Sequence, residues 1–273
     1  MTTSHVPVLM YHSVSDHSSA AFAPYTVSPQ RFREHMSTIA ARGHRVLTVG
    51  QHVGELAGAR ADDTRPAVVI TFDDAFADFH STALPILAEF GFAATLYVPS
   101  AFVGKTSRWL AEEGEGDRPI IAWSALIEAM HAGVEVGSHS RSHADLDLAP
   151  APRLRAEVVD SKGELEDRLQ VPVTTFAYPF GHSNAAVRRA VIAAGYSSGV
   201  AVRDLASGGE SAHRMNRWTV HGEMTARDLD ALLDTRTGRL AAMRSDARSL
   251  VSVGLRRSGL KRHADVLSET SGA

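Results

Sequence analysis

The chain has 273 residues, 44% of them hydrophobic, and a formal net charge of -3 at pH 7. This length suits one large α/β domain or two small ones, and the hydrophobic fraction is enough for a sizeable core. The small net charge gives no overall field that would attract nucleic acid. The chain contains no cysteine, which excludes disulfide bonds, thiolate metal sites and cysteine nucleophiles.

Apolar runs and helix signals alternate along most of the chain, and this alternation indicates a parallel sheet. Glycine and charged residues are frequent in residues 104–119, which are therefore predicted to form a surface insertion. In chain order, the sequence predicts strand 6–11, helix 31–42, strand 44–49, a helix ending at 57, loop 58–66, strand 67–72, helix 75–90, strand 92–98, helix 123–131, strand 134–138, helix 150–170, strand 173–178, helix 184–194, strand 196–202, a short strand 218–220 and helix 225–235.

Two groups of polar side chains follow predicted strands. Asp73 and Asp74 come directly after strand 67–72, and His139 and His143 come after strand 134–138. On a helical turn, residues i and i+4 share one face, so both imidazoles can reach one ion. Two imidazoles and one carboxylate form an open ligand set for a catalytic divalent metal, which leaves the second carboxylate for proton transfer. Chemistry at the carboxyl ends of strands is typical of (β/α) barrels.

Each group also has a simpler interpretation. The two aspartates could cap the helix predicted from residue 75, and most of the 14 histidines are expected to be ordinary surface residues. Because successive side chains of a strand point to opposite faces, Asp73 and Asp74 can share a site only if the chain turns out of the strand there. We favour a site because both groups occur together, each at the end of an apolar strand.

Thr71-Phe72-Asp73-Asp74 and His139-Ser-x-x-His143 resemble the first two motifs of the polysaccharide deacetylases. This is the NodB-homology group, also called carbohydrate esterase family 4. The resemblance covers roughly residues 5–235 and implies an irregular (β/α) barrel with about seven parallel strands, so we expect a deacetylase domain over 1–235. It also implies that Asp74, His139 and His143 hold one divalent ion, with Zn²⁺ expected first among the transition metals, and that Asp73 is the catalytic base.

Residues 176–181, with the sequence FAYPFG, resemble the third motif of the family. The family usually has an arginine at the position of Ala177, where it would orient the base, so that role is either vacant here or filled by another group. The Tyr-Pro-aromatic-Gly form is similar to the subgroup near the poly-N-acetylglucosamine deacetylases. The resemblance implies that the Phe180 N–H is an oxyanion donor, placed by the turn at Pro179 and Gly181. The alternative is a simple strand-to-loop turn.

Amide cleavage also needs an acid that protonates the leaving amine. Many family members place a Leu-x-x-His strand near the C-terminus for this step. Here the pattern occurs at the N-terminus, from Leu9 to His12, which resembles a circularly permuted version in the biofilm-type deacetylases. His12 is therefore the predicted acid and His221 the second candidate, while an ordinary histidine near a barrel mouth is the alternative for either.

Aromatic residues near these motifs are candidates for substrate contacts, although aromatic residues of barrels are more often part of the core. The predicted contacts are Tyr11, Tyr178, Pro179 and Trp218. The predicted activity is metal-dependent removal of N-acetyl groups from amino sugars of a polysaccharide or glycoside, so the expected partner is an N-acetylated carbohydrate. An O-acetyl esterase or a small-amide deacylase could use the same site, and a non-catalytic carbohydrate-binding relative would keep only the pocket.

The C-terminal part, residues 236–273, differs in character. Its arginines and lysines up to Arg262 are set against one acid, Asp246, with apolar residues between them. It could be a basic amphipathic helix on a membrane or a partner protein, or a solvated helix or tail. The N-terminus has no basic patch followed by an apolar run, and no stretch approaches the roughly 20 apolar residues of a spanning helix. We therefore expect a cytoplasmic protein, with export left open if the sequence is trimmed or uses another route.

Overall fold

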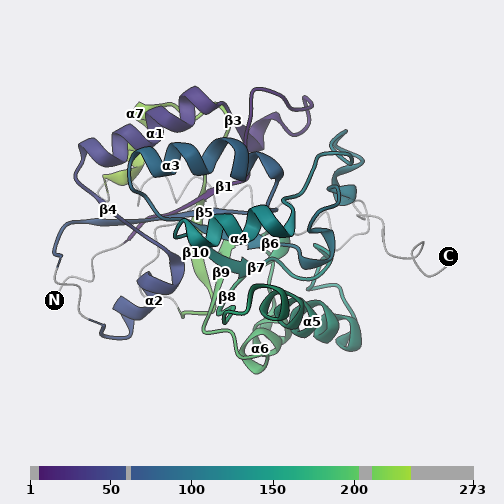
Figure 1. The fold of residues 1–273 in the computed structure, drawn as a ribbon. Coiled ribbons are helices and arrows are strands. Elements are labelled where there is room, and N and C mark those ends of the chain that lie inside the picture. Colours follow the sequence, from purple (N-terminus) through teal and green to yellow (C-terminus); the bar gives the residue numbers. More distant parts are fainter. Residues whose placement is uncertain (1–5, 60–62, 203–210, 235–273) are drawn as a thin grey trace.

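Seven parallel strands form a closed barrel in the computed structural model, which describes residues 6–59, 63–202 and 211–234. The order around the barrel is β1, β10, β9, β8, β7, β6 and β5, and β5 pairs back with β1 (Figure 1). A short additional strand, β4, pairs with the start of β5. The predicted (β/α) barrel is confirmed. The strands are Val8–Tyr11 (β1), Arg45–Leu47 (β4), Ala67–Phe72 (β5), Thr95–Val98 (β6), Glu135–Ser138 (β7), Thr175–Ala177 (β8), Ser198–Val202 (β9) and Met215–Thr219 (β10).

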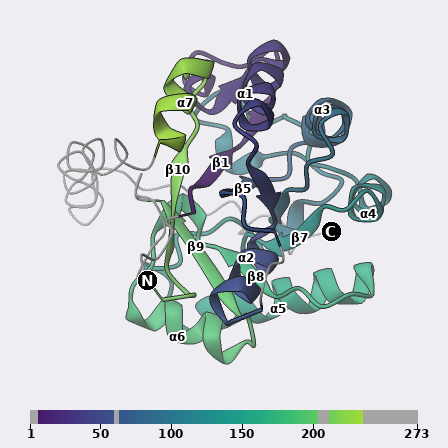
Figure 2. The same ribbon diagram turned by 90° about the vertical axis from the view of Figure 1, so that its left-hand side faces the viewer.

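Helices cover the outside of the barrel. α1 packs against α7, and α5 packs against α6 on another side of the molecule (Figure 2). Several helices begin at side chains that accept a backbone N–H, as Ser28, Thr48, Asn184 and Thr225 do. The helices are Pro29–Ala41 (α1), Val49–Leu56 (α2), Leu84–Glu89 (α3), Trp123–His131 (α4), Ala151–Leu169 (α5), Ala185–Ala193 (α6) and Ala226–Leu233 (α7).

The structure differs from the predicted elements in three places. The helix predicted over 75–90 begins after an irregular turn and contains a π-helical segment, Phe79–Ala83, before α3. The last strand spans Met215–Thr219 rather than 218–220. The segment after β1 forms a small pair of strands that was not predicted, Ser13–Val14 (β2) and Thr26–Val27 (β3). Short 3₁₀ turns complete the described elements: Ala23–Tyr25 (η1), Ser100–Phe102 (η3), Arg108–Leu110 (η4) and Pro179–Gly181 (η5).

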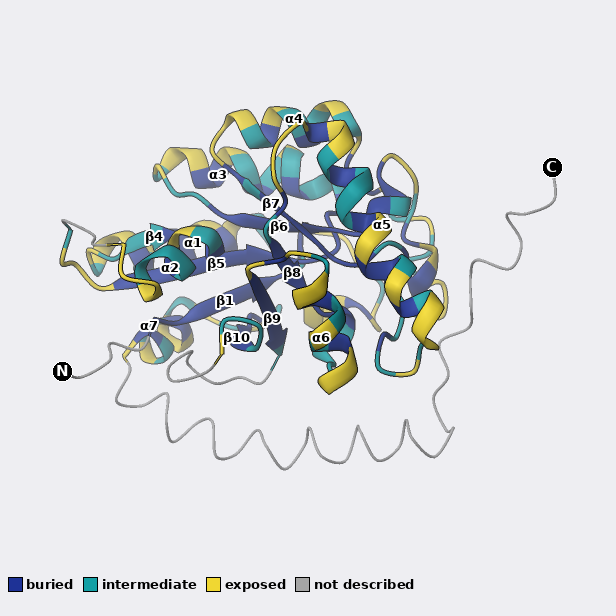
Figure 3. Ribbon diagram, turned by 90° about the horizontal axis from the view of Figure 1, so that it is seen from below, coloured by how far each residue is buried: buried dark blue, intermediate teal, exposed yellow. Residues whose placement is uncertain are grey.

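Strand alternation sorts the core into two layers. One cluster includes Val8, Val69 and Val200 and fills the inside of the barrel, while a larger cluster packs between the barrel and its helices. The strands themselves are almost entirely buried (Figure 3). At two-residue intervals, Asp73 follows Val69 and Arg217 follows Met215, so both point inward. The apolar plug at one end of the barrel thus gives way to charged residues at the carboxyl ends of the strands.

Two predictions concern parts of the chain at the limits of the structure. The basic segment 236–273 lies outside the described residues, and so does the proposed domain boundary at residue 235. Among the helices that the structure describes, none is both long and apolar enough to cross a bilayer.

Gly137, on the inward face of β7, leaves no room for a side chain. A Cβ atom added there would lie 2.5 Å from Cε1 of Tyr97 and 2.8 Å from Cγ2 of Thr175. We expect Gly137→Ala to lower the free energy of unfolding by about 1–3 kcal/mol because the core is overpacked. Gly163 in α5 is the matched control, since nothing lies within 4 Å of its added Cβ and alanine should gain roughly 1 kcal/mol of helix propensity. Urea denaturation measures both, and equal effects would contradict this packing account.

Candidate metal and active site

Asp73 and Asp74 reach one site because the chain turns sharply where β5 ends. The Asp73 N–H still donates to the Tyr11 carbonyl at 3.0 Å, but φ is +71° at Asp74 and +53° at Ala75. These left-handed values are unusual for residues with a Cβ. They break the strand alternation that would otherwise send the two carboxylates to opposite faces, so both carboxylates lie buried at the barrel mouth.

The segment between His139 and His143 is an irregular turn, and the helical turn expected from the sequence is wrong. Ser140 has φ of +62° and His143 has φ of +55°. The buried carboxylate of Glu157, from α5, holds the turn by accepting the N–H groups of Arg141 at 3.0 Å and Ser142 at 2.8 Å. The sequence analysis did not identify Glu157, because its partners, two backbone N–H groups and the Ser142 hydroxyl, form no motif with it in the sequence.

The turn nevertheless brings both imidazoles to Asp74. Nε2 of His143 lies 3.2 Å and Nε2 of His139 lies 3.6 Å from Oδ1 of Asp74. One ligand atom from each of the three residues falls within 4.8 Å of the others. Within the described residues, the buried Oδ1 of Asp74 has no hydrogen-bond partner. A buried carboxylate oxygen facing two imidazole nitrogens is the environment that a divalent cation would complete.

The protonation states of these residues suit metal binding, which needs neutral imidazoles and an ionised carboxylate. Nδ1 of His139 donates to the carbonyl of Ala177 at 2.9 Å, which leaves Nε2 with its lone pair facing the site. Burial lowers the pKa of His139 to about 4, although Asp73 raises it, so the ring is neutral at pH 7. Burial raises the pKa of Asp74, but His143, His12 and His139 together bring it well below its ordinary value, so the carboxyl is ionised.

Asp73 is held by Arg217 of β10, a residue that the sequence analysis missed. The guanidinium NH1 and NH2 donate to Oδ1 and Oδ2 of Asp73, both at 2.6 Å, and NH1 also donates to Thr71 at 3.2 Å. Burial raises the pKa of Asp73, but Arg217 and then His139 bring it below its ordinary value. Arg217 thus supplies the cation beside the predicted base, and it comes from two strands away from Ala177, the position where the family's arginine was expected.

His12 and His221 occupy different positions relative to the carboxylates. In the β1–β5 register Tyr11 pairs with Phe72, which places His12 opposite Asp73. Burial lowers the pKa of His12 below its ordinary value, and the charges of Asp74 and Asp73 offset this only in part. The ring of His12 lies 5.1 Å from that of Tyr25, and the exposed His221 lies on Tyr25 at 6.4 Å. The structure therefore brings His12 to the carboxylates.

The turn Pro179–Gly181 places Phe180 beside the histidines. Phe180 has φ of +57°, and its ring meets that of His143 edge-on at 4.7 Å. Pro179 is buried at the start of this turn. The predicted oxyanion role of the Phe180 N–H stays a prediction.

Three of the predicted aromatic contacts lie in the core instead of the site. Tyr11 is fully buried, with its hydroxyl 3.2 Å from Nδ1 of His35, and Tyr178 is fully buried, with its hydroxyl donating to the His213 carbonyl at 2.8 Å. Trp218 alternates with Arg217 on β10 and belongs to the outer layer between barrel and helices. None of the three therefore offers a ring face to a substrate, because strand alternation turns them away from the barrel mouth.

The site and the barrel agree with comparisons to known proteins. Residues 60–199 match the family model for polysaccharide deacetylase, and the chain belongs to that family. A Bacillus subtilis (strain 168) protein that carries the name polysaccharide deacetylase YxkH is 25% identical over 234 residues, which make up 84% of this chain and 76% of that protein.

Solved structures share the same fold. Streptococcus pyogenes deacetylase PplD, solved in complex with acetate, has a TM-score of 0.72 at 24% identity, covering 84% of this chain and 97% of that one. IcaB from Ammonifex degensii has a TM-score of 0.71 at 20% identity, with coverage of 84% and 97%.

The Arg217–Asp73 pair should control stability in a pH-dependent way. In the wild type the folded-state pKa of Asp73 is lowered, so its stabilising contribution is present at neutral pH and is lost as pH falls through that pKa. Arg217→Met leaves a buried carboxylate without its cation and should cost about 3–5 kcal/mol at pH 7. Its Asp73 pKa should rise, so the difference from wild type should shrink between pH 7 and pH 5. Chemical denaturation at both values measures this.

Arg217→Lys is the control, because it keeps one cation while losing the two-pronged geometry. It should lose less stability than Arg217→Met. A stability difference between Arg217→Met and wild type that does not change with pH would contradict the assignment of the effect to Asp73.

Proposed function

We propose that the chain is a metal-dependent hydrolase that removes N-acetyl groups from N-acetylated amino sugars. One observation carries the proposal: Asp73, beside the candidate ligands Asp74, His139 and His143, is ionised and fixed by Arg217 at 2.6 Å. A protein that only binds carbohydrate has no need of a second, oriented carboxylate next to a metal site. Family membership supports deacetylation, and the N-acetyl specificity is part of the proposal.

Asp74, His139 and His143 would hold a divalent ion, with Zn²⁺ the first candidate because two imidazoles and a carboxylate suit it. When bound, such an ion supplies Lewis acidity toward water and the acetyl oxygen. The fit rests on the orphaned Oδ1 of Asp74 and on the His139 tautomer, which the Ala177 carbonyl fixes. Both features leave electron pairs pointing into one space.

The remaining steps belong to residues of this chain. Asp73 accepts a proton from the attacking water, and each of its oxygens keeps a lone pair for this after accepting from Arg217. The water oxygen adds to the acetamide carbonyl, and the Phe180 N–H donates to the oxygen that gains charge. His12 acts in its imidazolium form: it gives a proton to the leaving nitrogen and becomes neutral, so that the C–N bond breaks and acetate and an amine result.

Purified protein should contain about one transition-metal ion per chain after loading and should release acetate from N-acetylated chito-oligosaccharides. Chelation should abolish the release, and Zn²⁺ should restore it. An O-acetylated oligosaccharide is the comparison substrate. Full activity without any transition metal would refute the metal proposal, and turnover of the O-acetyl substrate alone would make the protein an esterase.

Replacing Asp73 and Asp74 one at a time distinguishes the catalytic base from the metal ligand. Asp73→Asn should retain the metal, because Asp74 and both histidines remain, and should lose about 10²–10⁴-fold in rate. The asparagine oxygen can still accept a hydrogen bond from Arg217, which should limit the loss of stability. Asp74→Asn should instead lose metal affinity. Metal content by mass spectrometry together with acetate release measures both, and the opposite pattern would exchange the two roles.

The acid is tested by comparing leaving groups. His12→Ala should slow amide hydrolysis far more than hydrolysis of an activated aryl acetate, because a phenolate of low pKa leaves without a proton and an amine does not. His221→Ala, which changes an exposed histidine beside the ring of Tyr25, should affect both substrates little. Equal losses on both substrates for His12→Ala would show that His12 positions the substrate and does not protonate the leaving group. A selective loss in His221→Ala would move the acid to His221.

A further inference from the structure

Trp109 comes from residues 104–119, which the sequence predicts as a surface insertion, yet the structure builds this segment into the barrel mouth. The Gly104 N–H donates to the Ile121 carbonyl at 2.8 Å, and the Ser107 hydroxyl donates to the Glu115 carbonyl at 2.6 Å. Ile120 also forms a bridge with Phe76, two residues after Asp74. The 3₁₀ turn that carries Trp109 therefore has a fixed place next to the metal ligands.

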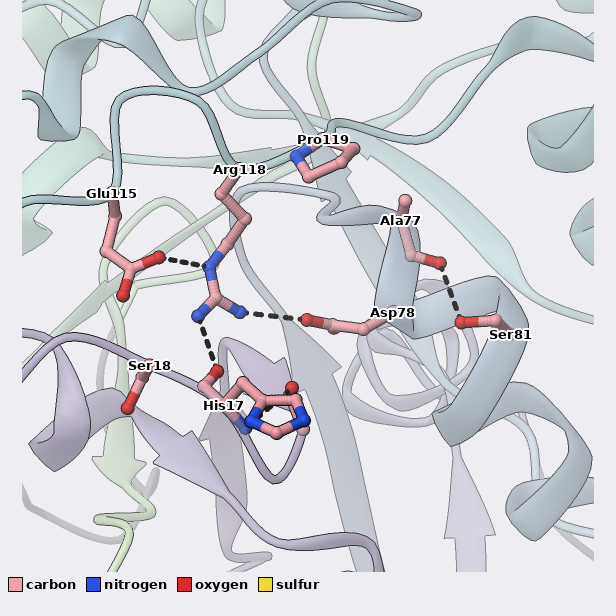
Figure 4. A pocket seen from close by; sticks show the side chains of 9 residues that line it. His17, Ser18, Ala77, Asp78, Ser81, Glu115, Arg118 and Pro119 are labelled. Carbon is pink, nitrogen blue, oxygen red and sulfur yellow. Dashed lines mark hydrogen bonds and ion pairs between the residues drawn. The ribbon is translucent and has the colours of Figure 1, made fainter.

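Arg118 anchors the same segment (Figure 4). Its guanidinium donates to Glu115 at 2.9 Å, to Asp78 at 3.1 Å and to the His17 carbonyl at 2.9 Å. It lies 5.3 Å above the ring of Phe22 and the same distance from the ring of Phe76. Arg118, Glu115, Asp78 and His17 border a recess of about 530 Å³. Because its charged groups are bonded to one another, we read this recess as the anchor of the segment and not as a ligand site.

The anchored segment stacks Trp109 on a candidate metal ligand. The indole lies 5.0 Å from the ring of His143, with an angle of 18° between the two planes, and 4.8 Å from the ring of Phe102. Phe180 meets His143 from another direction. Aromatic contacts thus hold this imidazole, whose buried Nδ1 has no hydrogen-bond partner in the part of the chain that is described.

The indole nitrogen is the unexplained part of this arrangement. Only 8% of Trp109 is exposed, and its Nε1 is buried without an acceptor among the described residues. Leaving a buried N–H donor unpaired is unfavourable, and a tryptophan N–H usually has an acceptor when it is buried. A smaller apolar side chain would pack against His143 without this cost. Nε1 of Trp218 is also unpaired, but it lies in the outer layer, whereas the ring of Trp109 stacks on a candidate metal ligand, where a substrate oxygen could serve as the acceptor.

We propose that Trp109 is a substrate-binding residue whose Nε1–H donates to an oxygen of the N-acetylated sugar, while its ring closes the side of the site next to His143. The inference rests on the proposed function. Since the bond goes to the sugar and not to the acetyl group, Trp109 selects acetylated sugars over acetylated compounds that lack a sugar ring. It makes the segment 104–119 a determinant of specificity.

Trp109→Phe removes the N–H and keeps an aromatic ring on His143. It should lower kcat/KM for an N-acetylated chito-oligosaccharide about tenfold, the effect of one lost hydrogen bond, and should leave hydrolysis of an aryl acetate within about twofold. Metal affinity should not change. Trp218→Phe is the matched control, because Nε1 of Trp218 is equally buried and unpaired within the described residues but lies in the outer layer. It should change neither substrate.

A measurement on the unmutated protein guards against misfolding of the variant. The chain has three tryptophans and hence three indole N–H resonances. Adding the deacetylated chito-oligosaccharide, the expected product, should shift the resonance of Trp109 and not that of Trp218. Unchanged sugar kinetics in Trp109→Phe with no shift would overturn the proposal. Equal losses on both substrates, with weaker metal binding, would also overturn it and make Trp109 a support for His143. If wild-type protein releases no acetate from the sugar, the proposed function fails first.

Discussion

The buried pair of Arg217 and Asp73 is the interaction on which the rest of the site depends. A carboxylate inside a barrel is strongly disfavoured unless a cation and hydrogen bonds replace the water that it loses. Arg217 provides both, since it is fully buried and binds both oxygens of Asp73. With one aspartate neutralised in this way, the remaining charge of Asp74 faces two imidazoles, the environment in which a cation is favourable. The pair therefore separates the two neighbouring carboxylates into different chemical roles.

Left-handed backbone conformations assemble these groups. Among the described residues, five of the six non-glycine residues with positive φ lie at the site or directly beside it: Asp74, Ala75, Ser140, His143 and Phe180. Such conformations are costly for residues with a Cβ and persist only where surrounding structure enforces them. Here Glu157 holds one turn through two backbone N–H groups. The strands set the positions of the motifs, and these turns set the directions of the side chains.

The sequence predicted the barrel, most strands and the residues that form the candidate metal site, because apolar runs ending in Asp-Asp and HxxxH are local signals. It missed Arg217 because the last strand was predicted to begin at residue 218, whereas it begins at Met215. It also placed Tyr11, Tyr178 and Trp218 in the site, although an aromatic residue near a motif can face either layer of the core. Which face it takes depends on strand register, and register is fixed only when the barrel closes.

Closure of the barrel explains why the site draws on both ends of the domain. β1 lies between β5 and β10, pairing Tyr11 with Phe72 on one side and Leu9 with Trp218 on the other. His12, directly after the first strand, and Arg217, from the last, therefore both lie near Asp73, although they are far apart in the sequence. An open sheet without β1 would leave β5 and β10 unpaired at this seam, and Arg217 could not be held against Asp73. The site therefore depends on closure of the barrel, which makes the pairing of β1 as much a requirement of the chemistry as of the fold.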